Sequence, residues 1–172
     1  TTLAKKLHKK FKNSKYLHLK PYILYQDRRT IIKNPHFQKK SSSFLSLLRL
    51  LSWLISYKVF FNQNKKKQFY FFDRYAHDVL IDSLRYRHNL SKSLTKFILN
   101  FFPNPDLWIF LNPPLKIIKS RKLELSDNEF KRQIEDYKKF FIKQKNVLML
   151  DINIPKTKLT KKITKSITNL IK

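Results

Sequence analysis

The chain has 172 residues, of which 38 are lysine or arginine and 11 are aspartate or glutamate, so its formal net charge is +27. A hydrophobic fraction of 42%, with 15% aromatic residues, excludes an intrinsically disordered chain and is typical of a single globular domain over residues 1–172. The absence of cysteine excludes a disulfide scaffold and a cysteine-based metal site.

The charge predicts attraction to polyanions such as nucleic acid, nucleotides or anionic lipid. An AT-rich coding sequence offers another explanation, because lysine, isoleucine, asparagine and phenylalanine are plentiful while glycine is absent. On that explanation the lysines only cover a solvated surface. The N-terminus is basic and amphipathic and has no apolar signal region, which fits a cytoplasmic protein.

The first fifteen residues predict a helix with a stop at Asn13-Ser14, because Leu3, Leu7 and Phe11 recur about one turn apart and form an apolar stripe. The segment Tyr16–Leu19 then predicts a short strand, closed by Lys20-Pro21. The polar stretch that follows, as far as Ser43, predicts an exposed loop of the kind that often forms a lid or a binding loop.

Phe44–Phe61 is the most apolar segment and approaches the length of a membrane span. Within a bilayer, Arg49 and Lys58 would cost about 2.5–3.5 kcal/mol for each central charge. Ser46, Arg49, Ser52 and Ser56 are spaced as one narrow polar stripe. We therefore expect a nearly buried helix of a soluble domain and no membrane span, with an interfacial helix as the alternative.

Three further segments are apolar on both faces, as in buried parallel strands: Gln68–Asp73, Pro105–Asn112 and Asn146–Asp151. Helical patterns alternate with them at Ser91–Phe102, Pro114–Arg121, Asp127–Lys145 and Lys156–Lys172. This alternation predicts βαβ units and an α/β fold with a parallel sheet.

Asp73 ends one of these strands, and ligands of open parallel sheets bind beyond the carboxyl ends of the strands. Arg74, the next residue, is suited to bidentate phosphate binding. The pair predicts a site for Mg²⁺ and phosphate; a buried ion pair that only orders the turn is the alternative.

The segment FFDRYAHDVLIDSLRYR (71–87) resembles the Asp-Arg-Tyr motif of the thymidylate kinase family of P-loop nucleotide kinases. PDLWIFLNPPLKIIKSRK (105–122) resembles that family's next strand and its arginine-bearing lid, and NVLMLDINIP (146–155) resembles its last strand. The resemblance implies a P-loop NTPase three-layer αβα fold. It also implies a nucleoside-monophosphate kinase that uses ATP and Mg²⁺ and phosphorylates a nucleotide such as dTMP.

By the same resemblance, TTLAKKL follows the Gly-Lys of a G-x-x-x-x-G-K-[ST] phosphate loop. The loop and the first strand would then precede Thr1, and the chain as given would be truncated within the motif and inactive. Thr1 would ligate Mg²⁺, and Thr1 and Thr2 would bind the ATP phosphates.

The motif departs from the D-R-Y-x-x-S-x-x-A-Y-Q that is usual in thymidylate kinases, because it reads D-R-Y-x-x-D-x-x-x-D-x-x-R-Y. That pattern is closer to a thymidylate-kinase-like subgroup often found beside polysaccharide-biosynthesis genes, and it leaves the acceptor open. Asp78 and Asp82 either bind a hydroxyl of the acceptor or pair with Arg85 and Arg87.

The resemblance implies the following roles. Asp73 would orient Mg²⁺ or its water ligands, and Arg74 would hold the acceptor phosphate. Arg121 would close over the transferring phosphoryl group, with Arg132 as a second lid residue. The residues expected at the acceptor are Arg74, Tyr75, Asp78, Arg49 and Lys20.

Expected partners are nucleotides and a second copy of the chain, for which the apolar segment 44–61 offers a surface. The rival hypotheses are a catalytically inactive or truncated kinase fold and a basic module that binds polyanions, although nucleic acid is the less expected ligand. Charge alone does not explain apolar strands that end in Asp73 and Asp151.

Overall fold

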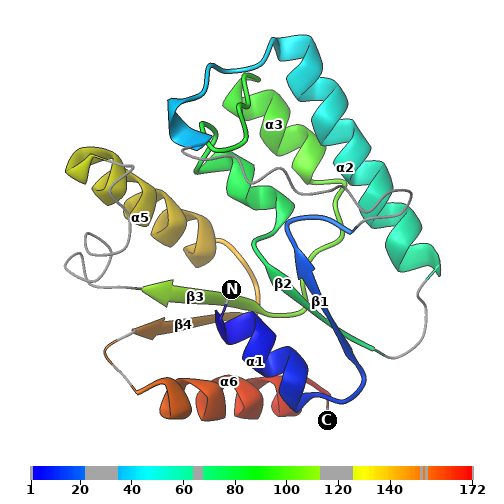
Figure 1. Ribbon diagram of the computed structural model, residues 1–172, viewed down its shortest axis with the longest axis vertical. Coiled ribbons are helices and arrows are strands. Elements are labelled where there is room, and N and C mark those ends of the chain that lie inside the picture. The colour runs from blue at the N-terminus through cyan, green and yellow to red at the C-terminus, as the bar shows by residue number, and fades with distance from the viewer. Residues whose placement is uncertain are drawn as a thin grey trace. The chain divides into compact units, whose positions relative to one another are not determined.

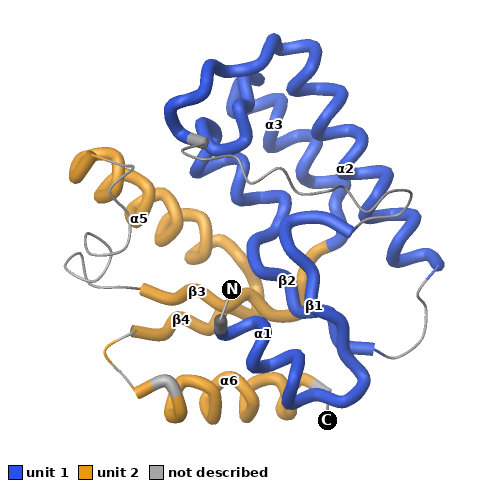
Figure 2. The backbone as a smooth tube through the Cα atoms, in the orientation of Figure 1, with its two compact units in different colours: residues 1–103 blue, residues 104–172 orange. Residues whose placement is uncertain are grey.

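The computed structural model describes residues 2–21, 35–63, 68–112, 126–151, 153 and 155–171. The chain divides into two compact units, residues 1–103 and 104–172 (Figure 2), and each is described by itself. The single domain expected from the sequence stays a prediction.

In unit 1 the elements follow the order α1 (Thr2–Lys10), β1 (Ser14–His18), η1 (Pro35–Phe37), α2 (Ser43–Gln63), β2 (Phe69–Asp73), η2 (Ala76–Leu80) and α3 (Lys92–Leu99), as Figure 1 shows. β1 and β2 pair in parallel, with Ser14 opposite Phe69 and His18 opposite Asp73, so both strands end at the same edge. The parallel pairing that the sequence predicts is confirmed.

Helix α1 ends earlier than its periodicity predicts. The Ser14 hydroxyl donates to the Phe11 carbonyl at 2.6 Å and so satisfies a backbone acceptor at the helix end. The ring of Phe11 packs on Phe69 and Phe71 of β2, with centroids 4.9 and 5.5 Å apart. This contact holds α1 against the strands.

Helix α2 buries one stripe, formed by Ser46, Leu50, Trp53, Tyr57 and Phe60. The expected near-complete burial is wrong, because the opposite face exposes large apolar side chains: Phe44, Leu45, Leu48, Leu51 and Ile55. The expected polar stripe is also wrong, since Ser46 is fully buried whereas Ser52 is exposed. By length and composition alone, α2 passes the test for a helix that crosses a membrane.

Tyr57 is the centre of the core of unit 1 and has no exposed surface. Its ring contacts Phe72, Tyr75 and Phe102 at centroid distances of 5.5, 4.8 and 5.4 Å. Its hydroxyl donates to the carbonyl of Leu19, immediately after β1. The core therefore extends to the edge where β1 and β2 end.

Among the residues that the structure describes, four have positive φ, and none of them is glycine: Leu19, Arg74, Arg87 and Asn146. Leu19 and Arg74 directly follow β1 and β2. The left-handed region disfavours residues with a Cβ and costs about 1–3 kcal/mol at each position. Because the chain contains no glycine, residues that carry a Cβ adopt these positive-φ conformations.

In unit 2 the order is β3 (Trp108–Asn112), α5 (Asp127–Ile142), β4 (Val147–Asp151) and α6 (Lys156–Ile171). β3 and β4 are parallel, with Asn112 opposite Asp151, and Figure 1 shows α5 and α6 on opposite faces of the pair. The order strand, helix, strand, helix that was predicted here is confirmed. The helix expected at Pro114–Arg121 lies outside the described residues.

Each helix of unit 2 covers its strand with an apolar face. Phe141 of α5 packs on Trp108 and Phe110, with ring centroids 5.7 and 5.0 Å apart. In α6, Leu159 and Ile163 are buried at a spacing of one turn. The unit is thus a layered α/β arrangement built from local sequence periodicity.

Candidate functional site at the carboxyl ends of β1 and β2

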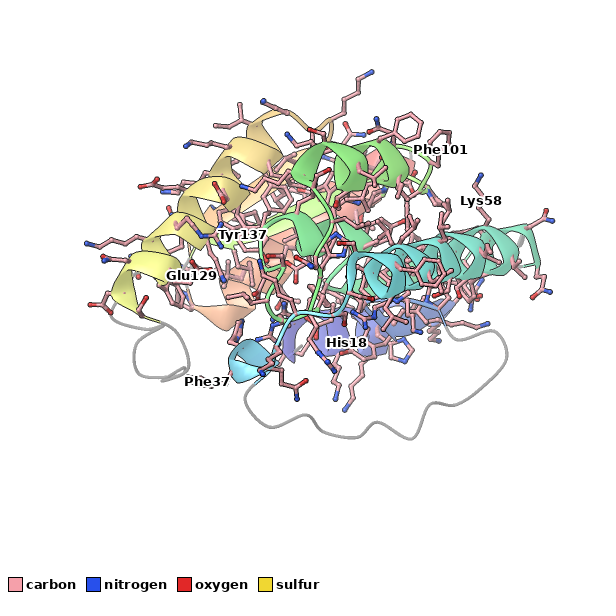
Figure 3. All side chains as sticks on the ribbon, turned by 90° about the horizontal axis from the view of Figure 1, so that it is seen from above. His18, Phe37, Lys58, Phe101, Glu129 and Tyr137 are labelled. Carbon is pink, nitrogen blue, oxygen red and sulfur yellow. The ribbon has the colours of Figure 1, made fainter. Side chains whose placement is uncertain are left out.

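Asp73 is the last residue of β2, and its carboxylate lies beside the end of β1. Its Oδ2 accepts a hydrogen bond from the Tyr16 hydroxyl at 3.2 Å and lies 3.3 Å from Nδ1 of His18, the last residue of β1. His18 is labelled in Figure 3. The side chain of Asp73 is 16% exposed. An acceptor-rich group thus lies where parallel sheets bind their ligands.

Arg74 follows at φ 77°, and its guanidinium turns back to Asp78. Nη1 of Arg74 donates to Oδ2 of Asp78 at 2.6 Å, and the Tyr86 hydroxyl donates to the same oxygen at 2.6 Å. Asp78 is buried, at 8% exposed, whereas the Arg74 side chain keeps 26% of its surface exposed. Burial and the Asp78 charge raise the pKa of Tyr86, which therefore stays a neutral donor.

Arg49 projects from α2 to the same turn. Its Nη1 donates to the backbone carbonyl of Tyr86 at 2.5 Å, and its Nη2 donates to the Ser41 hydroxyl at 3.0 Å. Burial, and then the charge of Arg87, lower the pKa of Arg49. The two arginines expected at the acceptor, Arg49 and Arg74, are thus connected through Tyr86.

Asp82 forms a separate buried cluster. Its carboxylate lies 3.0 Å from Nε2 of His36 and accepts from Nε of Arg85 at 3.0 Å. Of the pairings left open by the sequence, Arg85 with Asp82 is the one observed, since Nε of Arg87 donates to the carbonyl of Lys39. A contact between Asp78 or Asp82 and an acceptor hydroxyl stays a prediction.

Tyr75 lies in the core rather than beside the arginines. It is 7% exposed, and its hydroxyl donates to the carbonyl of Pro103 at 2.6 Å. Its ring stacks on His77 with centroids 5.7 Å apart, and burial lowers the pKa of His77 to about 4. The observed contacts of Tyr75 are those of a packing residue.

Lys20 lies at the same edge as Asp73. It follows β1 by two residues, its backbone N–H donates to the carbonyl of His18 at 2.8 Å, and it is half-buried. Lys20 is therefore near the ends of both strands, and its contact with an acceptor stays a prediction.

Arg132 belongs to unit 2 and pairs within α5. Its guanidinium donates to both carboxylate oxygens of Glu129, at 2.5 and 2.8 Å, and to Asp136 at 2.6 Å. The hydrogen bond with Glu129 is the main reason that the pKa of Arg132 is raised. Figure 3 labels Glu129 on this helix. To bind phosphate as a lid residue, Arg132 would have to break its hydrogen bonds with Glu129 and Asp136.

Three of the expected site positions lie outside what the structure describes. These are Arg121, Thr1 and the side chain of Thr2. Their expected roles stay predictions.

The carboxylate of Asp73 suits Mg²⁺, which prefers oxygen ligands and takes most of them from phosphates and water in nucleotide sites. Among the described residues, no group of three or more histidine and carboxylate side chains gathers into a metal cage. A single carboxylate at a strand end therefore fits a nucleotide-held ion rather than an ion bound by the protein alone.

Sequence reasoning missed Tyr16, His18, His36 and Tyr86. His18 carried a usable signal, because it ends a strand directly before Leu19-Lys20-Pro21. Nothing in the sequence indicated that Tyr86 would reach Asp78, since the turn between them has no regular periodicity.

Comparison with protein-family profiles and with curated protein sequences finds no match. Among solved structures, the chain is similar to the thymidylate kinase of Candida albicans, a structure described as revealing the origin of broad substrate specificity. The TM-score is 0.64 and the sequence identity 18%, over 98% of this chain and 85% of that one. At this identity the likeness shows the fold alone: the predicted α/β architecture with parallel strands is confirmed, and it is similar to the fold of that thymidylate kinase.

Proposed function

We propose that the protein is a nucleoside-monophosphate kinase, which transfers the γ-phosphate of ATP to a nucleotide such as dTMP. The observation that carries the proposal is the Asp73–Arg74 pair at the shared carboxyl ends of β1 and β2, in a thymidylate kinase-like fold. Both groups are partly exposed, as a site for an incoming ligand requires.

Phosphoryl transfer asks a protein mainly for positioning and charge neutralisation. Arg74 would bind the acceptor phosphate. Arg49, which donates a hydrogen bond to the carbonyl of Tyr86, would add a second positive charge. Tyr16 and His18 would fix the Asp73 carboxylate so that it orients the cation or its water ligands. ATP with Mg²⁺ supplies the phosphoryl group and neutralises its charge.

The ATP side of the site rests on Thr1, Thr2, Arg121 and Arg132 as proposed phosphate ligands. Assays use the full-length natural protein.

The test is ATP- and Mg²⁺-dependent phosphorylation across a panel of nucleoside monophosphates. Asp73→Asn and Arg74→Ala are expected to lower kcat/KM by about 10²-fold or more, because each removes an electrostatic contact to the transferring or accepting phosphate. Asp106→Asn and Lys96→Ala, both at exposed positions, are the matched controls. Activity of both site variants within a few-fold of the wild type would refute these roles, and an inactive wild type would favour a degenerate kinase fold.

As a partner we propose a second copy of the chain, acting in the cytoplasm. The exposed residues Phe44, Leu48, Leu51 and Ile55 follow one another along α2 at spacings of four, three and four. On the adjoining helix α3, Leu94 and Phe97 are exposed three residues apart, and Phe101, just beyond the helix, projects outward in Figure 3. Such stripes are the pattern by which helices pack on helices.

A further inference from the structure

We propose that Asp78 and Tyr86 are positioning residues, which hold the guanidinium groups of Arg74 and Arg49 in one fixed frame for an acceptor phosphate. This inference rests on the proposed function. It assigns to Asp78 a role toward the protein's own arginines, in place of a direct contact with the acceptor.

One oxygen of Asp78 carries the arrangement. Oδ2 accepts from Arg74 and from the Tyr86 hydroxyl, each at 2.6 Å. Such charge-assisted bonds are about twice as strong as neutral ones. Because Asp78 is buried, its charge is best balanced when Arg74 stays beside it.

The bond to Asp78 fixes the plane of the Arg74 guanidinium. That group has five N–H donors in a rigid planar fork. Holding Nη1 against Asp78 therefore sets the direction of the remaining donors. Arg74 has φ 77°, and its side chain is paired with Asp78, four residues further along the chain.

Tyr86 joins this bond to α2. Its hydroxyl binds Asp78, whereas its carbonyl accepts from Arg49. Its ring packs edge-on against Trp53, with centroids 5.6 Å apart and planes at 85°. The gap that Arg49, Trp53 and Tyr86 help to line is too narrow for a water molecule, so side-chain packing holds the link. Tyr86 thus sets where the two arginines lie relative to each other.

The kinetic test uses Tyr86→Phe, which removes only the hydroxyl and keeps the ring and the carbonyl. We expect the KM for the nucleoside monophosphate to rise about 5–10-fold, while kcat and the KM for ATP stay within about twofold. Asp78→Asn keeps the shape and removes the charge, so we expect a loss of about 10–100-fold in kcat/KM for the acceptor.

Tyr70→Phe is the matched control. Its hydroxyl bonds Gln68 Oε1 near the start of β2, at the strand end opposite Asp73, so its loss should leave both KM values unchanged. A merely structural role for Tyr86 would raise the KM for ATP and for the acceptor in parallel, and that result would overturn the proposal. An unchanged acceptor KM in both variants would do the same.

A second readout needs no activity. In NMR spectra with ¹⁵N-labelled arginine, the guanidinium of Arg74 should rotate slowly in the wild type and give resolved Nη signals. In Asp78→Asn these signals should collapse to one averaged signal; resolved signals in the variant would refute the positioning role. If the nucleotide panel finds no acceptor, the proposed function fails and this spectrum alone decides the inference.

Discussion

At the residue scale, Asp73, Asp78 and Asp82 each lie against cationic or hydroxyl partners. Asp27 is the only acidic residue that precedes them in the sequence. The partners are Tyr16 and His18 for Asp73, Arg74 and Tyr86 for Asp78, and His36 and Arg85 for Asp82. A carboxylate buried without a partner would cost several kcal/mol by order of magnitude. These carboxylates avoid that cost near a buried strand because residues of the surrounding strands and turns hydrogen-bond or ion-pair with them.

His77 makes stability depend on pH. Its folded pKa of about 4 lies below the usual 6.5, because burial disfavours the imidazolium. Between these two values the unfolded chain binds the proton and the folded chain does not. The contribution of His77 to the unfolding free energy should therefore be fully present above pH 6.5, fall by about 3 kcal/mol as the pH drops to about 4, and then level off.

Urea unfolding of the wild type and of His77→Phe at a series of pH values measures this contribution. The variant keeps an aromatic ring against Tyr75 and Phe102, so the packing changes little. Its stability should fall less steeply in this window than that of the wild type. His88, whose pKa burial also lowers, is present in both proteins and cancels in the difference. Parallel curves would contradict the assignment.

At the element scale, the sequence predicts which segments are helices and strands better than it predicts where they end. Periodicity identified α2, α5 and α6, and the apolar runs identified β2, β3 and β4. The end of α1 was missed because it depends on the Ser14 side chain and on the pairing of β1 with β2. Helical periodicity contains neither the hydrogen bond of a single side chain nor the pairing of strands that lie far apart in the sequence.

The error over α2 has a physical reason. Composition shows that a helix has an apolar surface, but not whether the same chain or a partner covers it. The site has the same limit: Asp73 and Arg74 were found because strand ends are readable, whereas Tyr86 was missed. Its approach to Asp78 depends on a turn whose shape includes Arg87 at φ 50°.

The exposed stripe of α2 predicts self-association. In Leu48→Lys/Ile55→Lys, two exposed apolar side chains become charged, which would place like charges in any helix-to-helix contact between copies. Sedimentation velocity should show a dimer for the wild type and a monomer for the double variant, without loss of helical circular dichroism. Gln63→Lys, at the exposed end of α2, is the control with an added charge and should remain a dimer. A monomeric wild type would exclude this surface as the interface.

At the scale of the whole molecule, 38 basic residues face 11 acidic ones, so an excess of 27 positive charges remains even when every acidic residue forms an ion pair. Mutual repulsion among positive charges disfavours the compact state. Added salt weakens this repulsion, since the Debye length falls from about 30 Å at 0.01 M to about 3 Å at 1 M. Salt also weakens exposed pairs such as Arg132–Glu129, but those contribute only about 0.2–1 kcal/mol each.

Repulsion should therefore dominate, and the midpoint of thermal unfolding should rise by several degrees over that range of sodium chloride. Lys161→Glu/Lys165→Glu, at exposed positions of α6 one turn apart, removes charge without touching the buried face. This variant should be more stable than the wild type at low salt and indistinguishable from it at high salt. If salt lowered the midpoint of thermal unfolding equally in both proteins, repulsion between the lysines would be negligible. The lysines would then be well separated on a solvated surface. A wild type stabilised far more by a short DNA duplex than by sodium chloride at equal ionic strength would instead indicate that the charge serves a polyanion.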